Sequence, residues 1–154
     1  MLERLLKQDQ RVKRALLAAA IACLAAAGAE AAPSCKSLSV TALAFGNYNV
    51  YSAVPLDSAG TISYSCPPPT TPTVTIDAGL AFGNGTRRMT LAAGGDWLAY
   101  EIFVDAARSI VWSSTPVSVP AGNAATVPFY ARAFASQDVS VGSYSDTLTV
   151  TFNF

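Results

Sequence analysis

Few residues in this sequence have the types and spacing that catalysis requires. The 154 residues include no histidine, which excludes a Ser–His or Cys–His nucleophile and a histidine general base. A glycosidase needs two carboxylates across a cleft, and spacing singles out no such pair among the acidic residues after the N-terminal region. These are Asp57, Asp77, Asp96, Glu101, Asp105, Asp138 and Asp146. We therefore expect no enzyme and no cofactor; a hydrolase would require some of these acids to converge in a cleft with perturbed pKa values.

The cysteines offer a different chemistry. Cys35 and Cys66 are the two that remain once the N-terminal region described below is removed. In an oxidising compartment an intramolecular disulfide is the default for such a pair. Closing the loop from Cys35 to Cys66 would stabilise the fold by roughly 3–4 kcal/mol. The alternative is a metal site, which would need carboxylates as further ligands because the chain has no histidine. We predict the disulfide and no metal.

The N-terminal region has the three parts of a secretory signal peptide. Five basic residues lie between Met1 and Arg14, an Ala- and Leu-rich run extends from Ala15 to Ala27, and Ala29-Glu30-Ala31 fits a small-residue cleavage site. We predict a cleaved signal peptide at residues 1–31 and one mature domain at residues 32–154. A membrane anchor is the alternative, but a spanning helix needs about 20 apolar residues and this run is shorter.

Cys23 lies inside the apolar run, where a lipoprotein signal would also place a cysteine. The preceding Ala20 is a poor match to the leucine that is usual in such a signal, and the run continues apolar beyond Cys23. We expect this cysteine to be lost with the signal peptide.

Cleavage changes the charge of the chain. The whole sequence has ten basic and ten acidic residues, of which residues 1–31 hold five and three, so the mature part carries five against seven, a net charge of −2. This is no basic footprint for nucleic acid. No further apolar stretch is long enough to span a membrane. Low charge and many Thr, Ser, Val and aromatic residues are typical of a β-protein that associates with other proteins.

Apolar and polar residues alternate with a period of two through most of the mature part, which indicates half-buried β-strands. Predicted strands cover residues 38–42, 61–66, 73–77, 97–105, 127–131 and 147–154, with a short segment at 89–91. Turn-forming residues separate them, among them Pro55 to Gly60, Pro67 to Pro69, and Gly142. Short strands at regular spacing predict an all-β fold, a sandwich or a barrel.

Two polar sites between the strands carry smaller expectations. We expect Arg87 and Arg88 to lie on a solvated hairpin. We expect Asp146, close to Tyr144, to serve a turn or a hydrogen bond at the start of a strand.

The C-terminal segment has the cleanest alternation. Its apolar positions share one face: Leu148, Val150, Phe152 and Phe154. The polar positions, Thr and Asn, share the other face. An ordinary closing strand of a sandwich and a strand whose edge is handled by another protein have this same pattern, so alternation does not separate the two interpretations.

Short motifs along nearly the whole mature part point to a family. They are Phe45-Gly46-x-Tyr48, Gly60-x-Ile62-x-x-x-Cys66, Ile76-Asp77-x-Gly79, Arg88-Met89, Leu98-x-Tyr100-x-Ile102-Phe103-x-Asp105-Ala106-Ala107-Arg108 and Gly142-x-Tyr144-x-Asp146-Thr147-Leu148-x-Val150-Thr151. Together they resemble the spore coat protein U domain, which is shared with subunits of archaic chaperone–usher pili. The stretch from Tyr100 to Arg108 and the Gly-x-Tyr-x-Asp motif are the most specific pieces.

The resemblance implies an immunoglobulin-like, pilin-type β-sandwich that is incomplete because it lacks its last strand. A periplasmic chaperone would supply a strand, and at the outer-membrane usher the N-terminal extension of a neighbouring pilus or coat subunit would replace it. The family places residues 147–154 at one edge of this groove, with Leu148, Val150, Phe152 and Phe154 in its lining. It also implies that a Cys35–Cys66 disulfide joins the first two strands. An open sheet edge is an aggregation hazard, which explains the need for a chaperone.

One departure from the family refines the expected role. After the predicted cleavage, only Ala32-Pro33-Ser34 precedes Cys35, and three residues reach roughly 10 Å at most, too short for a donor strand. We therefore expect a strand acceptor without its own donor segment: a terminal, tip or minor subunit of a secreted surface fibre (pilus or fimbrium) or coat. It would pass through the periplasm to the cell surface and act in cell adhesion and biofilm formation. The alternatives are a mature start different from the predicted one and a coat protein that assembles in another way.

The alternative function is a free-standing surface adhesin or lectin-like binding module. Aromatic side chains such as Trp97, Trp112 and Tyr51 would then stack on sugars or apolar surfaces. Each tryptophan equally suits the filling of a core.

Overall fold

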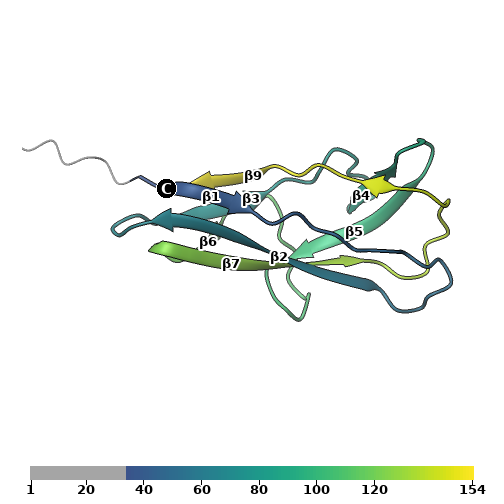
Figure 1. The fold of residues 1–154 in the computed structure, drawn as a ribbon, viewed down its shortest axis with the longest axis horizontal. Helices are drawn as coiled ribbons and strands as arrows, with labels where there is room; N and C mark the ends of the chain where they lie inside the picture. Colours follow the sequence, from purple (N-terminus) through teal and green to yellow (C-terminus); the bar gives the residue numbers. More distant parts are fainter. Residues whose placement is uncertain (1–33) are drawn as a thin grey trace, which may run out of the picture. The chain divides into compact units, whose positions relative to one another are not determined.

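Nine β-strands make up the regular structure of residues 34–154, the part of the chain that the computed structural model describes (Figure 1). They are β1 (Lys36–Val40), β2 (Leu56–Cys66), β3 (Thr73–Ile76), β4 (Arg87–Leu91), β5 (Trp97–Phe103), β6 (Val117–Ser118), β7 (Gly122–Ala133), β8 (Tyr144–Ser145) and β9 (Val150–Asn153). The signal peptide predicted at residues 1–31, with Cys23, lies outside the described residues. Within residues 34–154 there is no helix with the length and apolar character needed to cross a membrane.

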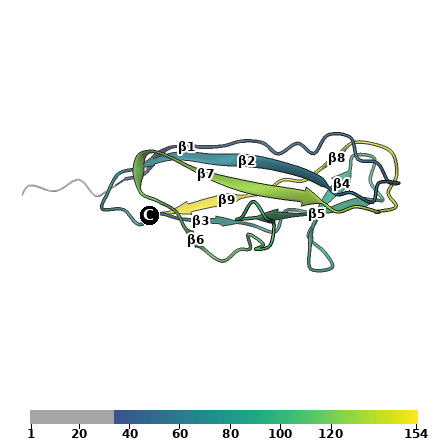
Figure 2. The same cartoon turned by 90° about the horizontal axis from the view of Figure 1, so that it is seen from below.

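The strands form two antiparallel sheets, which confirms the all-β prediction. The large sheet has the order β1-β2-β7-β5-β4-β8, and the small sheet has the order β6-β3-β9. Figure 2 shows β1, β2 and β7 in one layer and β3 and β9 in the other, while the large sheet curls so that β5 reaches the layer of the small sheet. The hydrophobic core lies between the layers.

The core consists of the inward faces that the period-two pattern predicts. Their buried residues alternate along the strands: Ile62, Tyr64 and Cys66 in β2, Val74 and Ile76 in β3, Leu98, Tyr100 and Ile102 in β5, and Phe129, Ala131 and Ala133 in β7. Trp112 is also fully buried, and its indole Nε1 donates to the carbonyl oxygen of Val74 at 3.4 Å. Trp112 therefore fills the core, whereas Trp97 is about half exposed.

The turn predicted from Pro55 to Gly60 is wrong. β2 begins at Leu56, and its first residues pair with the end of β7, from Leu56 opposite Ala133 to Gly60 opposite Phe129. Gly60 is needed for close packing rather than for a turn, because a Cβ atom there would collide with the ring of Phe129. The long ladder with β7 outweighs the weak strand propensity of this segment.

The solvated hairpin predicted for Arg87 and Arg88 is also wrong. Arg87 is only 3% exposed and forms an ion pair with the buried Glu101. Its guanidinium also donates to three carbonyl oxygens, those of Ile76, Asp77 and Trp112. The end of β3 thus has its carbonyl groups satisfied by a side chain, which draws this arginine into the interior.

Arg88 lies on the opposite face of β4 from Arg87. Its guanidinium stacks over the ring of Trp97 at 5.0 Å, and its Nε donates to the carbonyl oxygen of Ala81 at 2.7 Å.

A disulfide joins Cys35 to Cys66, with an S–S distance of 2.01 Å and a Cα–Cα distance of 4.3 Å. It connects the residue before β1 to the last residue of β2. The start of the first strand is therefore covalently attached to the core strand β2.

Candidate functional site

A long hollow runs along the side of the sandwich where the two sheets come to their edges. It has a volume of about 1090 Å³ and lies between residues 40–50, the first wall, and residues 139–150, the second wall. We call it the groove. Its floor consists of core side chains: Ile76, Met89, Leu98, Tyr100, Ile102 and Phe129. All of these except Met89 are at most 3% exposed, so the groove lies directly above the hydrophobic core.

Among residues 34–154 no strand pairing joins the two walls, although the second wall contains β8, which pairs with β4. β1 pairs only with β2, and β9 pairs only with β3, so within residues 34–154 no strand lies between these two sheet edges. In Figure 1 the chain after β1 (dark blue) crosses β5, while the chain before β9 (yellow) runs above it. Beyond Val40 the first wall is attached by isolated hydrogen bonds, such as that from the Thr41 amide to the carbonyl oxygen of Thr61 at 3.0 Å. The two walls leave main-chain groups available along the groove.

Two of the four C-terminal residues predicted for the groove line it. Leu148 and Val150 belong to the second wall and pack on the core. Phe152 packs against the ring of Tyr64, with ring centroids 4.8 Å apart. Phe154 is 62% exposed, with its ring centroid 6.5 Å from that of Phe152. The structure therefore divides this segment into a part that lines the groove and a part that lies beyond it.

The first wall was not predicted as part of the site. Leu43 and Phe45 turn inward and pack against the core, and the rings of Phe45 and Tyr100 meet edge to face at 5.8 Å. The signal in the sequence was the Phe45-Gly46-x-Tyr48 motif, which lies in this wall. Gly46 has a positive φ of 76°, a conformation that favours glycine.

Asp146 fastens the second wall to the floor. Its carboxylate accepts hydrogen bonds from the hydroxyl of Tyr100 at 2.7 Å and from the backbone amides of Leu80 at 3.0 Å and Thr147 at 2.8 Å. Burial, together with the hydrogen bond to Asp146, raises the pKa of Tyr100 above its usual value, so the phenol stays protonated and keeps donating. The hydrogen-bonding role predicted for Asp146 is confirmed, and it extends to the floor of the groove.

Asp77 holds the second wall at Thr149, three residues after Asp146. Its Oδ1 accepts from the backbone amides of Thr149 at 2.9 Å and Gly79 at 3.1 Å. Burial alone would raise the pKa of Asp77, but the hydrogen bonds from Thr149 and Gly79 and the charge of Arg87 outweigh it, so the pKa is lowered. Asp77 is therefore ionised at neutral pH.

A side-chain network holds both walls at the end of the groove far from the disulfide. The hydroxyl of Tyr48 donates to the carbonyl oxygen of Phe134 at 2.9 Å and accepts from the amide of Gln137 at 2.8 Å. The Gln137 side chain bonds both backbone groups of Ala99, at 2.7 and 2.9 Å, as a neighbouring strand would. Asp96 accepts from the amide of Ser140 at 2.6 Å. These side chains thus position the walls, in addition to the short main-chain pairing of β8 with β4.

This arrangement suits the binding of an extended chain rather than a reaction. A strand lying in the groove would find main-chain partners on both sides and apolar side chains beneath it. Among residues 34–154 no group of three or more Cys, Asp or Glu side chains is placed to hold a metal ion.

Two facing sheets with an apolar groove between unpaired edges define a pilin-like β-sandwich. The sequence matches the Spore Coat Protein U domain over residues 20–151. It is 33% identical to Protein U of Myxococcus xanthus over 127 residues, which cover 73% of this chain and 71% of that protein. The chain therefore belongs to the spore coat protein U domain family.

A solved structure supports the same assignment. The fold is similar to a chain in the crystal structure of the CsuC–CsuE chaperone–tip adhesion subunit pre-assembly complex from the archaic chaperone–usher Csu pili of Acinetobacter baumannii. The TM-score is 0.55 at 25% sequence identity, and the match covers 79% of this chain but only 40% of that one. The protein is thus a structural fibre or coat component of a non-enzymatic family, and the family implies a surface or extracellular location.

Proposed function

We propose that the groove is an acceptor site for a β-strand of another protein, and that this chain is a strand-accepting subunit of a secreted fibre or coat. The observation that carries the proposal is the groove itself: the core residues Tyr100, Ile102 and Phe129 form its floor, and no strand of residues 34–154 closes it. The immunoglobulin-like fold would then be incomplete by one strand. Strand addition supplies affinity through main-chain bonds and selectivity through alternate side chains.

The groove specifies what the donor strand must look like. Each wall is about as long as a strand of ten residues. Successive side chains of a strand point to opposite faces, so alternate donor residues must be apolar to lie over the floor. A periplasmic chaperone would supply such a strand first, and a neighbouring subunit would replace it at the outer-membrane usher.

The first test is export of the full chain to a bacterial periplasm, with and without co-expression of its candidate periplasmic chaperone. Soluble yield, elution volume and thermal melting are measured. We expect a soluble, sharply melting protein only as a one-to-one complex with the chaperone. A stable monomer without the chaperone contradicts the proposal, because the sandwich would then be complete without a donor.

The finer part of the proposal is that the subunit accepts a strand but donates none. It is supported by the three residues between the predicted cleavage site and Cys35. Mass spectrometry of the exported protein tests it: a mature N-terminus at Ala32 agrees with a terminal, tip or minor subunit. A mature start a strand's length earlier would give the chain a donor segment and contradict this role.

Adhesion is a second candidate function, favoured by apolar side chains on neighbouring loops. Tyr51 is 94% exposed and Val141 is fully exposed, at 103%. Their loops meet where the amide of Ser136 donates to the carbonyl oxygen of Ser52. Binding of the purified subunit to glycan arrays and to apolar surfaces, compared with a Tyr51→Ser/Val141→Ser variant, tests this role; equal retention of both proteins contradicts it.

A further inference from the structure

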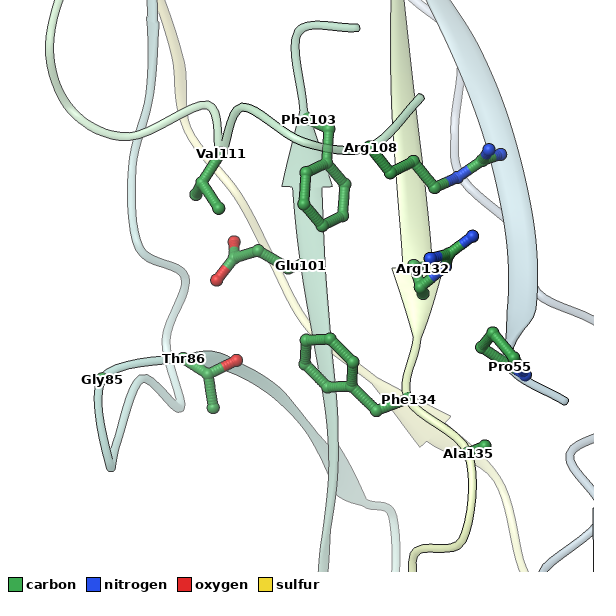
Figure 3. A pocket seen from close by; sticks show the side chains of 10 residues that line it. All are labelled: Pro55, Gly85, Thr86, Glu101, Phe103, Arg108, Val111, Arg132, Phe134 and Ala135. Carbon is green, nitrogen blue, oxygen red and sulfur yellow. The ribbon is translucent and has the colours of Figure 1, made fainter. Parts of the chain in front are cut away.

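A second hollow of about 580 Å³ lies on the outer face of the six-stranded sheet (Figure 3). Glu101 and Phe103 of β5 and Arg132 of β7 line it, and they alternate with the inward-facing residues of the same strands. We call it the outer pocket. It shares no lining residue with the groove, so occupation of the groove by a strand leaves it accessible.

One flank of the outer pocket carries an excess positive charge. Arg132 forms a forked pair with Asp57, with Nε–Oδ1 and Nη2–Oδ2 distances of 2.7 and 2.9 Å, and Arg108 Nη1 lies 3.3 Å from the same carboxylate. The hydrogen bond from Arg132 and the charge of Arg108 hold the pKa of Asp57 below its usual value. Two guanidinium groups therefore share one ionised carboxylate, which leaves one positive charge without a counter-charge in this cluster.

Both arginines keep donors for a ligand. The hydrogen bonds within residues 34–154 use Nε and Nη2 of Arg132, and Nε and Nη1 of Arg108. This leaves Nη1 of Arg132 and Nη2 of Arg108. A guanidinium pairs well with a carboxylate because both are planar and form charged hydrogen bonds.

The centre of the outer pocket is aromatic, and the opposite flank is an acceptor. In Figure 3 the rings of Phe103 and Phe134 lie between the two arginines on one side and Glu101 on the other. Phe134 is 37% exposed. The ion pair with Arg87 balances the charge of Glu101. The Oε1 atom of Glu101 accepts hydrogen bonds from Arg87 and from the amide of Ile102. Its Oε2 has no partner among the described residues and can accept from a hydroxyl group.

We propose that the outer pocket binds a hexuronic acid residue of an acidic polysaccharide. The carboxylate of the sugar pairs with Arg108 and Arg132, the C–H face of its ring packs on Phe103 and Phe134, and a hydroxyl donates to Glu101. The three features match three parts of one sugar, whereas an acidic peptide would use the arginines alone. The pocket volume lies in the range of small-ligand sites. This goes beyond strand acceptance, because it attaches the subunit to anionic polysaccharide at its outer face.

The test uses the exported full chain, purified as the soluble one-to-one complex with its chaperone, and calorimetric titration at low salt. The chaperone alone is titrated as the blank. The probes are a trimer of α-1,4-linked galacturonic acid, its methyl ester, which keeps the rings but lacks the charge, and triglutamate. We expect the acid trimer to bind and both other probes to bind at least tenfold more weakly. Equal binding of the ester shows that charge recognition is absent, and equal binding of triglutamate shows a peptide site; either result overturns the proposal, as does no binding of the trimer at millimolar concentration.

Variants localise the binding. Arg132→Gln and Phe134→Ala, which removes the ring, are each expected to weaken binding of the trimer at least tenfold. Arg88→Gln is the matched control, because it removes a stacked arginine from the same sheet face outside the pocket. Melting curves verify that each variant is folded. Unchanged affinity in the folded Phe134→Ala variant, or equal losses in Arg88→Gln and Arg132→Gln, contradicts the assignment.

Discussion

The β2–β7 side and the groove side of this domain have the same alternating pattern but different outcomes. β2 and β7 form an uninterrupted ladder from Leu56 opposite Ala133 to Tyr64 opposite Ala125. The two walls of the groove also turn apolar residues inward, such as Phe45 and Leu148, yet both of these residues lie outside the strands. The second wall pairs with β4 only through the short β8. Alternation thus determines which face of a segment is buried, while a ladder requires a partner at the right place.

The two sides also satisfy polar groups in different ways. On the β2–β7 side, main-chain groups bond to main-chain groups. Around the groove, Asp146, Asp77 and Gln137 use their side chains to hold the walls. Side chains that already position the walls would reduce the conformational entropy that strand addition must overcome.

The largest expected effect comes from closing the open side. A C-terminal extension made of a short turn and a strand with four alternate apolar residues would cover the groove floor. The four newly buried side chains contribute roughly 6–12 kcal/mol together, and about eight new main-chain hydrogen bonds contribute roughly 1 kcal/mol each. Ordering about eight residues costs roughly 8–16 kcal/mol, so we expect the free energy of unfolding to rise by about 5 kcal/mol. Denaturant unfolding measures this rise.

The control for the extension replaces two of its apolar residues with aspartate. Equal stabilisation by both extensions would mean that the groove does not take up the strand.

Removing Arg87 should give the next largest effect, because Arg87 joins the large sheet to the end of β3 in the small sheet. Arg87→Met leaves Glu101 buried without its counter-charge, and three carbonyl oxygens lose a donor. We expect a loss of about 3–5 kcal/mol, against less than about 1 kcal/mol for Arg88→Met, which loses only a stacked, partly exposed contact. Chemical denaturation of both variants checks this order.

A double variant sharpens the same prediction. Arg87→Met combined with Glu101→Leu removes the uncompensated charge, so it should be more stable than Arg87→Met alone. If both unfold alike, the buried pair is not the source of the loss.

Breaking the disulfide should cost roughly 3 kcal/mol, from the entropy of the closed loop. The Cys35→Ser/Cys66→Ser variant frees the chain before β1, which continues into the first wall. Unfolding in urea, with the reduced wild-type protein as the control, measures this loss. Equal midpoints for the oxidised protein and the variant would contradict it.

Two tyrosine variants compare the sides at the level of one hydroxyl group. Tyr100→Phe removes a hydrogen bond to the carboxylate of Asp146, which should cost about 1.5–3 kcal/mol. Tyr64→Phe removes a bond of 2.8 Å to the carbonyl oxygen of Pro120 on the β2–β7 side, and should cost about 1 kcal/mol. Only Tyr100→Phe should also weaken the binding of a donor-strand peptide, as measured by titration; equal affinities would show that Asp146 does not position the wall.

The smallest effect is expected on acidification below about pH 4. The hydrogen bonds from Ser140 and Trp97 lower the pKa of Asp96, and Asp77 is shifted the same way. A carboxyl whose folded pKa is lowered contributes stability above its unfolded pKa of about 3.9 and loses it as the pH falls through that value toward the folded pKa. With no histidine in the chain, melting temperatures should be flat from pH 8 to 5 and fall below about pH 4.

Asp96→Asn is the variant that checks this assignment. Its melting temperature should fall less steeply below about pH 4 than that of the wild type. The same slope in both proteins would exclude Asp96 as a contributor.

Alternation along the sequence was sufficient to predict the all-β fold and its inner faces. Ile62 and Tyr64 in β2 and Tyr100 and Ile102 in β5 are buried as expected, because side chains on a strand alternate between faces whatever the strand pairs with. The two cysteines of the mature part also predicted a disulfide, and the Cys35–Cys66 disulfide is present in the structure. The motifs pointed to the family, and two of them lie in the walls of the groove.

Other features depend on segments far apart in the chain, and only the tertiary structure decided them. Residues 56–60 look like a turn, but β7 supplies the ladder that makes them a strand. Arg87 looks solvated, but the end of β3 places carbonyl oxygens around it. Leu148 lines the groove and Phe152 does not, although both share one face of the same alternating segment. The physical reason is common to all three: burial of a face is a local property of the pattern, whereas the partner of a backbone or charged group comes from elsewhere in the fold.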